Sequence, residues 1–350
     1  TTLQAQAFKI FENENIVTMI KFSKDLIFIY TFLIFLLGNN IHLFKRRFKF
    51  SIIDKLILLF TFLVTIYALV PVGEADLLSK LIYAKNLYNI SITYLIGRNI
   101  SLDEGFFTLV QKILKSLILF IAFFLFFEFI FSTHFHKLIE FSNYNSVINE
   151  IDSQGNYGLS WSFESQGSAP RYAAFFADPL ELSASLLLLI SMLLFNFWNN
   201  KKNINYFLIF LIVVAFLLSF SRGSIVACIG IILFGLLLNK NYKILLSMLV
   251  LVLISILSLL YFASDEIRYI IIDTINFQNT SSLGHLVEWI EGILSILENP
   301  FGIGLAMSGN ASGVDESFRV GGENQFLIFG VQMGVLSVIV YILILFFIIK

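Results

Sequence analysis

The sequence comprises 350 residues, of which 58% are hydrophobic and 13% charged, with a formal net charge of −1 at pH 7. Soluble globular chains average about a quarter charged residues. The long apolar blocks of this chain therefore exclude a water-soluble fold and predict an integral membrane protein. The near-neutral balance gives no support to a nucleic-acid partner, and the single cysteine, Cys228, excludes an intrachain disulfide.

Apolar blocks that approach the length of a bilayer span recur along the whole chain. A hydrocarbon core requires about 20 mainly apolar residues per helix. The blocks are 26–44, 52–70, 80–97, 113–131, 180–198, 204–220, 225–239, 244–262 and 325–349. The third is the least regular, because Lys80, Lys85 and Asn86 lie in its first half, and the seventh is short. We predict an all-α polytopic membrane protein with about nine transmembrane helices.

Four connections between the apolar blocks are rich in lysine and arginine. If the spans alternate in direction, all four connections lie on the same side of the membrane. These are 45–50, Lys112 with Lys115, 199–203 and 239–243. Positive charge marks cytoplasmic connections, so both long connections are expected to face outward. Basic residues before the first block (Lys9, Lys21 and Lys24) fit less well, and we expect a further span upstream of Thr1.

We expect a single membrane domain over 1–350, with interfacial helices in two outer loops. Its parts are N-terminal spans (25–131), the first outer loop (132–179), central spans (180–262), the second outer loop (263–324) and the last span (325–349).

The first outer loop ends in a helix start that an arginine precedes. In "ADPLEL", Asp178 suits the N-cap, Pro179 the first helical position and Glu181 the third. Capping explains both carboxylates better than acid–base chemistry does. Arg171 lies seven positions before the cap. It is either a surface residue or a phosphate ligand, which an arginine beside a helix N-terminus favours.

The stretch "SFSRGSIVA" places Arg222 in a tight outer hairpin between the sixth and seventh blocks. Arg222 can anchor the hairpin at the membrane interface. Alternatively, its planar five-donor fork points inward and binds an anion. Ser221 and Gly223 favour the second interpretation slightly, because a small residue and a hydroxyl allow a ligand to approach the backbone closely.

The second outer loop contains an amphipathic segment from His285 to Leu297, which "NPFGIG" ends. It is shorter than a span and is expected to lie flat on the membrane. His285 and Glu288 are three positions apart on one helix face, which permits an oriented histidine–carboxylate pair. A structural histidine is the alternative.

The same loop closes with Arg319, a glycine pair, and Glu323 with Asn324 at the start of the last span. Glu323 either complements the helix dipole or places a carboxylate at the depth of a membrane-surface reaction. The chain has no Cys/His cluster, Walker loop or nucleophile elbow, so no metal or nucleotide cofactor is predicted.

Taken in order, four segments resemble the O-antigen polymerase and ligase superfamily of bacterial membrane proteins, over about 168–345. They are Arg171 with "ADPLELSASL", "SFSRGSIVA", "EWIEGILSILENPFGIGL" and "ENQFLIFGVQMGVLSV". The resemblance implies glycosyl transfer on the outer face of the cytoplasmic membrane, toward the periplasm or cell exterior. The donor is a glycan on undecaprenyl pyrophosphate, the acceptor is a sugar hydroxyl of a second lipid-linked glycan, and neither a metal nor a nucleotide sugar is required.

The resemblance also implies roles for individual residues. Arg171 and Arg222, with Arg319 in support, would hold the pyrophosphate, where charge develops as the bond breaks. Glu323 would be the base, with His285 as second candidate. The supporting residues are Ser221, Glu288 and Asn324.

Several functions remain open at this point. Ligases of the superfamily tend to carry His–Asn where this chain has Glu323–Asn324, which favours a polymerase. A ligase would transfer finished glycan to a lipid A core or a protein. A lipid-linked glycan transporter would favour inverted repeats and broken helices, and no internal repeat is evident. A channel would leave the outer loops unexplained. Whether a chain-length regulator binds is also open.

Overall fold

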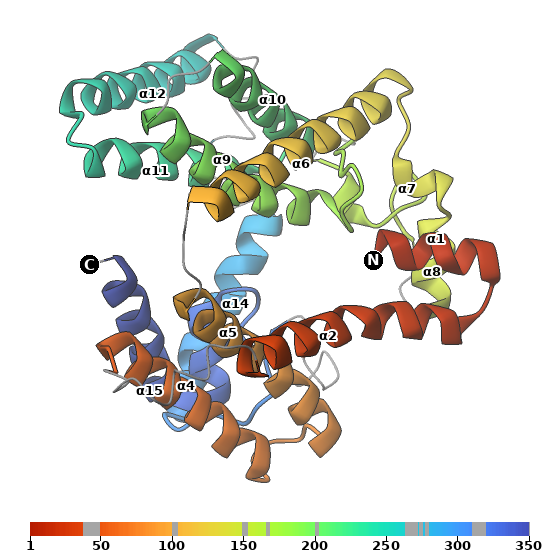
Figure 1. The fold of residues 1–350 in the computed structure, drawn as a ribbon, viewed down its shortest axis with the longest axis vertical. Helices are drawn as coiled ribbons and strands as arrows, with labels where there is room; N and C mark the ends of the chain where they lie inside the picture. The colour runs from red at the N-terminus through yellow and green to blue at the C-terminus, as the bar shows by residue number, and fades with distance from the viewer. Residues whose placement is uncertain are drawn as a thin grey trace. The chain divides into compact units, whose positions relative to one another are not determined.

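The computed structural model describes residues 1–37, 50–99, 104–148, 153–165, 169–199, 203–262, 272, 276, 280–309 and 320–349. Within these ranges the regular secondary structure is helical, with two isolated β-bridges (Figure 1). The helices are α1 (Thr2–Phe11), α2 (Glu14–Leu37), α4 (Ile52–Leu69), α5 (Leu77–Asn99), α6 (Glu104–Ile130), α7 (Phe135–Leu138), α8 (Phe141–Ile148), a 3₁₀ turn (Trp161–Phe163), α9 (Pro179–Asn199), α10 (Asn203–Ser219), α11 (Arg222–Leu238), α12 (Tyr242–Phe262), α14 (Thr280–Glu298) and α15 (Gln325–Ile349).

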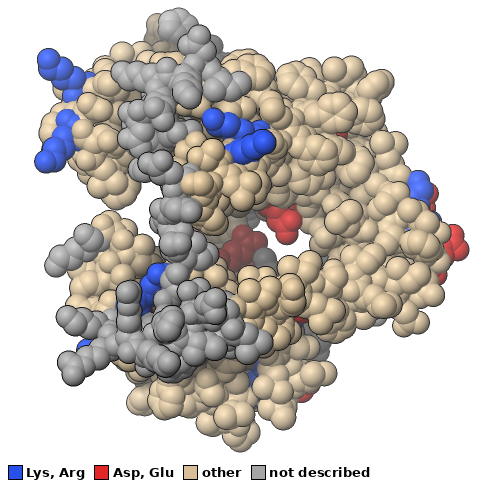
Figure 2. Space-filling view, viewed as in Figure 1, with Lys and Arg blue, Asp and Glu red and all other residues tan. Residues whose placement is uncertain are grey.

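Three helices of the described chain are long and apolar enough to cross a membrane, namely Ile52–Leu69, Gly105–Ile130 and Gln325–Ile349. Shorter apolar helices follow at Pro179–Leu194, Asn205–Ser219, Arg222–Leu238 and Tyr242–Leu251. Uncharged residues form most of the described surface of the face in Figure 2, with Lys and Arg in a few separate places. The helical structure and these apolar helices confirm the prediction of an all-α membrane protein. The number of nine spans stays a prediction.

The chain divides into two compact units by its internal contacts. Unit 1 comprises Thr1–Tyr30 and Ser101–Ser255, and unit 2 comprises Thr31–Ile100 and Ile256–Lys350. The single membrane domain expected from the sequence stays a prediction.

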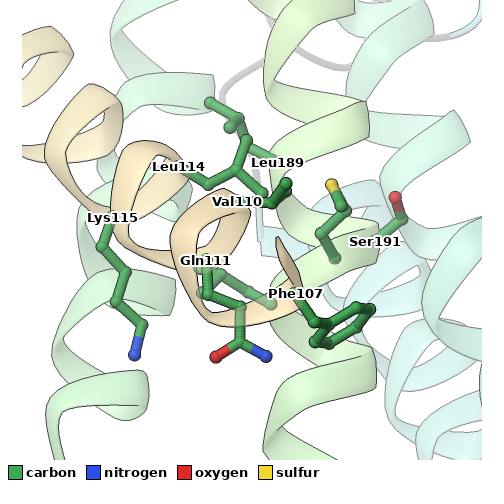
Figure 3. Close-up of a pocket in the computed structure, with 9 residues that line it drawn as sticks. Phe107, Val110, Gln111, Leu114, Lys115, Leu189 and Ser191 are labelled. Atoms are coloured by element: carbon green, nitrogen blue, oxygen red, sulfur yellow. The ribbon is translucent and has the colours of Figure 1, made fainter. Parts of the chain in front are cut away.

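In unit 1, a cavity of about 230 Å³ lies between the first half of α6 and the second half of α9 (Figure 3). Its lining is apolar except for Gln111, Lys115 and Ser191. None of the residues predicted to act in catalysis or binding lines this cavity. It therefore does not define the functional site.

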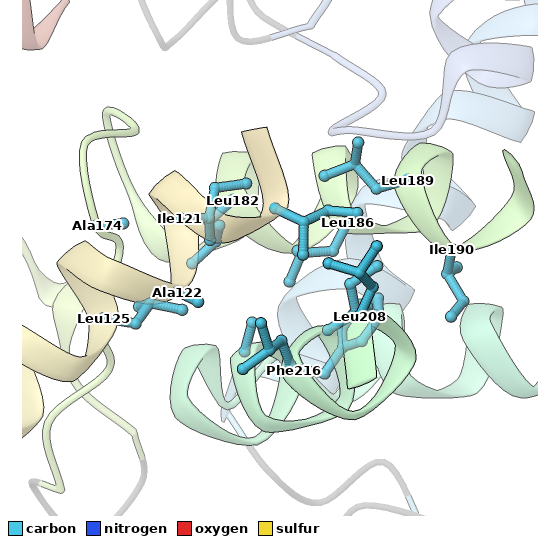
Figure 4. Packing of buried hydrophobic residues seen from close by; sticks show 14 of the residues in the cluster. Ile121, Ala122, Leu125, Ala174, Leu182, Leu186, Leu189, Ile190, Leu208 and Phe216 are labelled. Atoms are coloured by element: carbon cyan, nitrogen blue, oxygen red, sulfur yellow. The ribbon is translucent and has the colours of Figure 1, made fainter. Parts of the chain in front are cut away.

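The core of unit 1 is formed where α10 packs against α6 and α9, and α11 packs against α9. Leucine and isoleucine dominate it, and Leu186, Ile190 and Leu208 are almost fully buried (Figure 4). The repeated γ- and β-branched side chains that predict membrane helices thus also supply the contacts between them. This core positions the start of α11, which carries Arg222, and the end of α10, to which Arg171 is hydrogen-bonded.

The N-terminal helix α1 packs against α8 in the predicted first outer loop. The rings of Phe8 and Tyr144 meet edge to face, with centroids 6.3 Å apart. Thr2 donates a hydrogen bond to the carbonyl of Phe175 at 2.7 Å. The N-terminal segment is thus joined to this loop, as is expected if both lie on one side of the membrane.

In unit 2, α15 packs against α4 and α14, and it is broken at Gly334 (φ 76°, ψ −179°). The loop 299–304 fills the break. The N–H groups of Ile303 and Gly304 donate to the carbonyls of Val331 and Gln332, at 2.8 and 3.1 Å. Only glycine adopts the Gly334 conformation readily. The apolar block 325–349 does not predict this break, since glycine is common in membrane helices.

Candidate functional site

Arg171, Arg222 and Ser221, called here the arginine site, lie where the first outer loop meets the turn between α10 and α11. The N–H of Arg171 donates to the carbonyl of Phe163 at 2.9 Å, and the N–H of Tyr172 donates to that of Leu218 at 3.0 Å. The loop is therefore tied by its backbone to the end of α10.

The turn between α10 and α11 consists of Phe220 and Ser221. Phe220 has a positive φ of 50°, a left-handed conformation that commonly ends a helix. Arg222 is the first residue of α11 and is exposed. A cation is unfavourable at a helix N-terminus, whereas an anion is stabilised there. The position of Arg222 is thus easier to explain if an anion binds beside it.

A chain of hydroxyl groups fixes the start of α11. Ser221 contacts Ser224 with 3.1 Å between the hydroxyl oxygens, and Ser224 donates to Ser183 of α9 at 2.8 Å. Ser183 is fully buried. Ser221 is thereby linked to α9 through Ser224.

Arg171 is half-buried, and its side chain is held in place. Its Nε donates to the carbonyl of Ser219 at 3.0 Å. Burial lowers the pKa of Arg171, the charge of Arg222 lowers it further, and Asp178 acts in the opposite direction. Two cations that repel each other in this way form a favourable arrangement once an anion lies between them.

The helix start after Arg171 has the predicted caps. The N–H of Glu181 donates to Asp178 Oδ1 at 2.7 Å, and Glu181 Oε2 accepts from the N–H of Ala177 at 3.2 Å. Pro179 is the first residue of α9. Both carboxylates therefore serve the helix start, in agreement with the capping interpretation.

In unit 2, His285 and Glu288 lie on α14, and the segment that leads to Glu323 and Asn324 approaches Glu288 through Gly322. These four residues are called here the carboxylate site. His285 Nδ1 lies 3.5 Å from Glu288 Oε2, with both side chains partly exposed on α14. This is the histidine–carboxylate pair that their spacing permits. Helix α14 is amphipathic as predicted, but it begins five residues before His285, at Thr280.

The glycine pair before Glu323 is packed against α14. Gly321 and Gly322 have φ of 93° and 55°, and a Cβ on Gly322 would lie 2.3 Å from Glu288 Oε2. Any side chain there would clash with the carboxylate. The two glycines therefore pack closely against Glu288. As a result, the segment before α15 lies next to the His285–Glu288 pair.

Asn324 caps α15, because its Oδ1 accepts from the N–H of Phe326 at 3.0 Å. Glu323 consequently precedes the cap and is exposed, instead of lying in the first helical turn as the dipole interpretation assumed. That interpretation of Glu323 is weakened, since the dipole effect is confined to the first turn. Arg319 lies outside the described residues.

Sequence reasoning missed a buried polar cluster in unit 1, formed by Glu128, His134 and His136. All three side chains are almost completely buried. His136 Nε2 lies 2.6 Å from the carbonyl of Phe176. The signal that could have found the cluster is a carboxylate inside an apolar block, which is a functional hypothesis by default in a membrane protein.

Residues 207–342 match the family model described as O-antigen ligase. This segment contains Arg222, His285 and Glu323, and it begins after Arg171. No curated protein and no solved structure matches the chain.

Proposed function

We propose that this chain polymerises lipid-linked oligosaccharide repeat units, a proposal supported by the match of residues 207–342 to the O-antigen ligase family model. The donor is a glycan on undecaprenyl pyrophosphate, and the acceptor is a second lipid-linked glycan. The reaction takes place on the outer face of the bacterial cytoplasmic membrane.

The proposed reaction is a nucleophilic displacement at the donor sugar. A hydroxyl oxygen of the acceptor attacks the anomeric carbon, and the bond from that carbon to the phosphate oxygen breaks. Its electron pair leaves with undecaprenyl pyrophosphate, and the hydroxyl proton passes to a base. Negative charge grows on the leaving pyrophosphate, so cations fixed beside it lower the barrier.

The observation that carries the proposal is that the Arg171 side chain, tied to the carbonyl of Ser219, lies near enough to Arg222 to be affected by its charge. The charge of Arg222 lowers the pKa of Arg171, and Arg222 lies at a helix N-terminus. Two guanidinium groups and the N–H groups of a first helical turn are a suitable environment for a pyrophosphate. Arg319 is proposed as a third cation.

Glu323 is proposed as the base. Its exposure before the Asn324 cap supports this role, because a base must reach the acceptor hydroxyl. His285 is the second candidate, and its pairing with Glu288 would orient the imidazole. Glu288 and Asn324 would act as supporting residues in either case.

A ligase is the alternative, and the description of the matching family favours it. Ligases of the superfamily that the sequence resembles tend to carry His–Asn where this chain has Glu323–Asn324. The presence of a carboxylate at this position supports polymerisation, in which a second lipid-linked glycan supplies the hydroxyl.

The test is the glycan length profile of cells that lack this protein, complemented with wild type or Arg222→Ala. We expect single repeats in the deletion strain, a ladder with wild type, and no ladder with Arg222→Ala. Membrane levels of the variant are checked by immunoblot. Full-length chains that accumulate on undecaprenyl pyrophosphate in the deletion strain would instead identify a ligase.

A further inference from the structure

We propose that Glu128 is a positioning residue that holds Arg171 in the orientation needed to bind pyrophosphate. Glu128 does this through the turn formed by residues 173–176. The proposal rests on the proposed function, because it assigns a partner to the arginine site.

Glu128 lies in the last turn of α6 and is fully buried. Each of its carboxylate oxygens accepts a hydrogen bond from a different part of the first outer loop. Oε1 accepts from the N–H of Phe135 at 2.8 Å, and Oε2 accepts from the N–H of Ala174 at 2.9 Å. A single side chain thereby joins the beginning of the loop to its end.

The residue that Glu128 holds is in an unfavourable conformation. Ala174 has φ of 51°, a left-handed conformation that is unfavourable for a residue with a Cβ. The same turn is closed by a hydrogen bond from the N–H of Phe176 to the carbonyl of Ala173, at 3.0 Å. His136 holds its far side, with Nε2 lying 2.6 Å from the carbonyl of Phe176. The turn therefore depends on groups outside it.

This turn begins two residues after Arg171. The backbone N–H of Arg171 donates to the carbonyl of Phe163, and its side chain contacts the end of α10. Its Nε donates to Ser219, and its neighbour Tyr172 donates to Leu218. Helix α10 fixes one side of the segment, and Glu128 with His136 fixes the other. If the second side is released, the guanidinium of Arg171 can move away from Arg222.

The chemistry requires a carboxylate at position 128. Both oxygens accept from N–H donors, so both must be acceptors. A glutamine would direct its NH₂ group at one of these donors and lose that hydrogen bond. A buried carboxylate is costly to maintain. This cost argues that the two hydrogen bonds accepted by Glu128 do more than stabilise the end of α6.

The test measures binding of farnesyl pyrophosphate to the full chain in nanodiscs by calorimetry. We expect Glu128→Gln to weaken binding about tenfold or more, and Glu128→Asp, which keeps two acceptor oxygens, to weaken it less. Asp54→Asn is the matched control, since Asp54 is a buried carboxylate at the start of α4 in unit 2. We expect wild-type affinity for this variant.

A double-mutant cycle separates positioning from general loss of structure. Glu128→Gln in an Arg171→Ala background should cause no further loss of affinity, because Glu128 acts through Arg171. Equal fold-losses in both backgrounds, or wild-type affinity of a folded Glu128→Gln protein, would overturn the proposal. If Glu128→Gln does not fold, Glu128→Asp carries the same comparison. If wild type itself does not bind farnesyl pyrophosphate, the proposed function fails instead.

Discussion

The side chain of Arg171 donates a hydrogen bond from Nε to the main-chain carbonyl of Ser219, 48 positions further along the sequence, at 3.0 Å. Among the described residues, its two terminal nitrogens make no other hydrogen bond or ion pair. One guanidinium can therefore be fixed by the protein and bind an anion at once. A lysine cannot do both in the same geometry.

We predict that Arg171→Lys loses most transfer activity although the charge is kept. Loss of a charge-assisted fork contact of about 1.5–3 kcal/mol corresponds to about a 10- to 100-fold lower rate. The measurement is glycan transfer by the purified chain. Arg98→Lys is the control, because Arg98 pairs with Asp54 in unit 2 and a lysine preserves that ion pair. Wild-type transfer by Arg171→Lys would show that a simple positive charge is sufficient.

Glu323→Gln removes the proposed base while it keeps the shape of the side chain. We expect transfer to fall about 10²- to 10⁴-fold, with little change in donor binding, because the arginine site holds the pyrophosphate. Single-turnover rates and donor affinity are measured separately. If His285→Asn abolishes transfer and Glu323→Gln does not, His285 is the base.

Gly334→Ala is predicted to destabilise the protein strongly. A Cβ at this position would lie 2.3 Å from the carbonyl oxygen of Pro300, and the backbone conformation is one that only glycine adopts readily. We expect a loss of about 3 kcal/mol or more in the free energy of unfolding. Gly230→Ala on α11 is the control, because a Cβ there meets open space. It should be neutral or stabilising by up to about 1 kcal/mol. Equal stability of the two variants would mean that α15 is continuous.

Acid is predicted to destabilise the first outer loop through its buried histidines. Burial lowers the pKa of His134 and of His136 from 6.5 to about 4. For His134 the charge of Lys137 adds to this effect, and Glu164 opposes it. Between pH 6.5 and 4 the unfolded chain binds more protons than the folded chain, so the free energy of unfolding falls as pH falls. The slope is about 1.4 kcal/mol per pH unit for each histidine.

His134→Phe should reduce this acid sensitivity without loss of stability at pH 7.5. The imidazole lies among the rings of Tyr157, Phe163 and Tyr172. Neither of its nitrogens has a hydrogen-bond partner within the described ranges. Thermal unfolding of wild type and variant is followed from pH 4.5 to 7.5. A large loss of stability at pH 7.5 in His134→Phe would reveal a polar partner of this histidine.

Local patterns in the sequence predict the helices and their caps well. The block 325–349 coincides with α15, and the cap formed by Asp178, Pro179 and Glu181 begins α9. Apolar periodicity and capping chemistry act over a few neighbouring residues, so they can be recognised without knowledge of the fold.

Contacts between distant segments were not predictable in this way. The cluster of Glu128 and His136 forms only because α6 and the turn 173–176 meet in the folded chain. The break at Gly334 likewise depends on a loop that begins some thirty residues earlier in the chain. Glycine is compatible with both an intact and a broken membrane helix, so its presence alone does not decide between them.

The most direct test of polymerase activity uses the purified chain in liposomes, supplied with one lipid-linked repeat unit and no other acceptor. Products are separated by length after mild acid release from the lipid. We predict a ladder at multiples of the repeat unit, formed only when the protein is present. If the repeat unit stays single here, but is consumed once a lipid A core is added, the protein is a ligase and the proposed function is wrong.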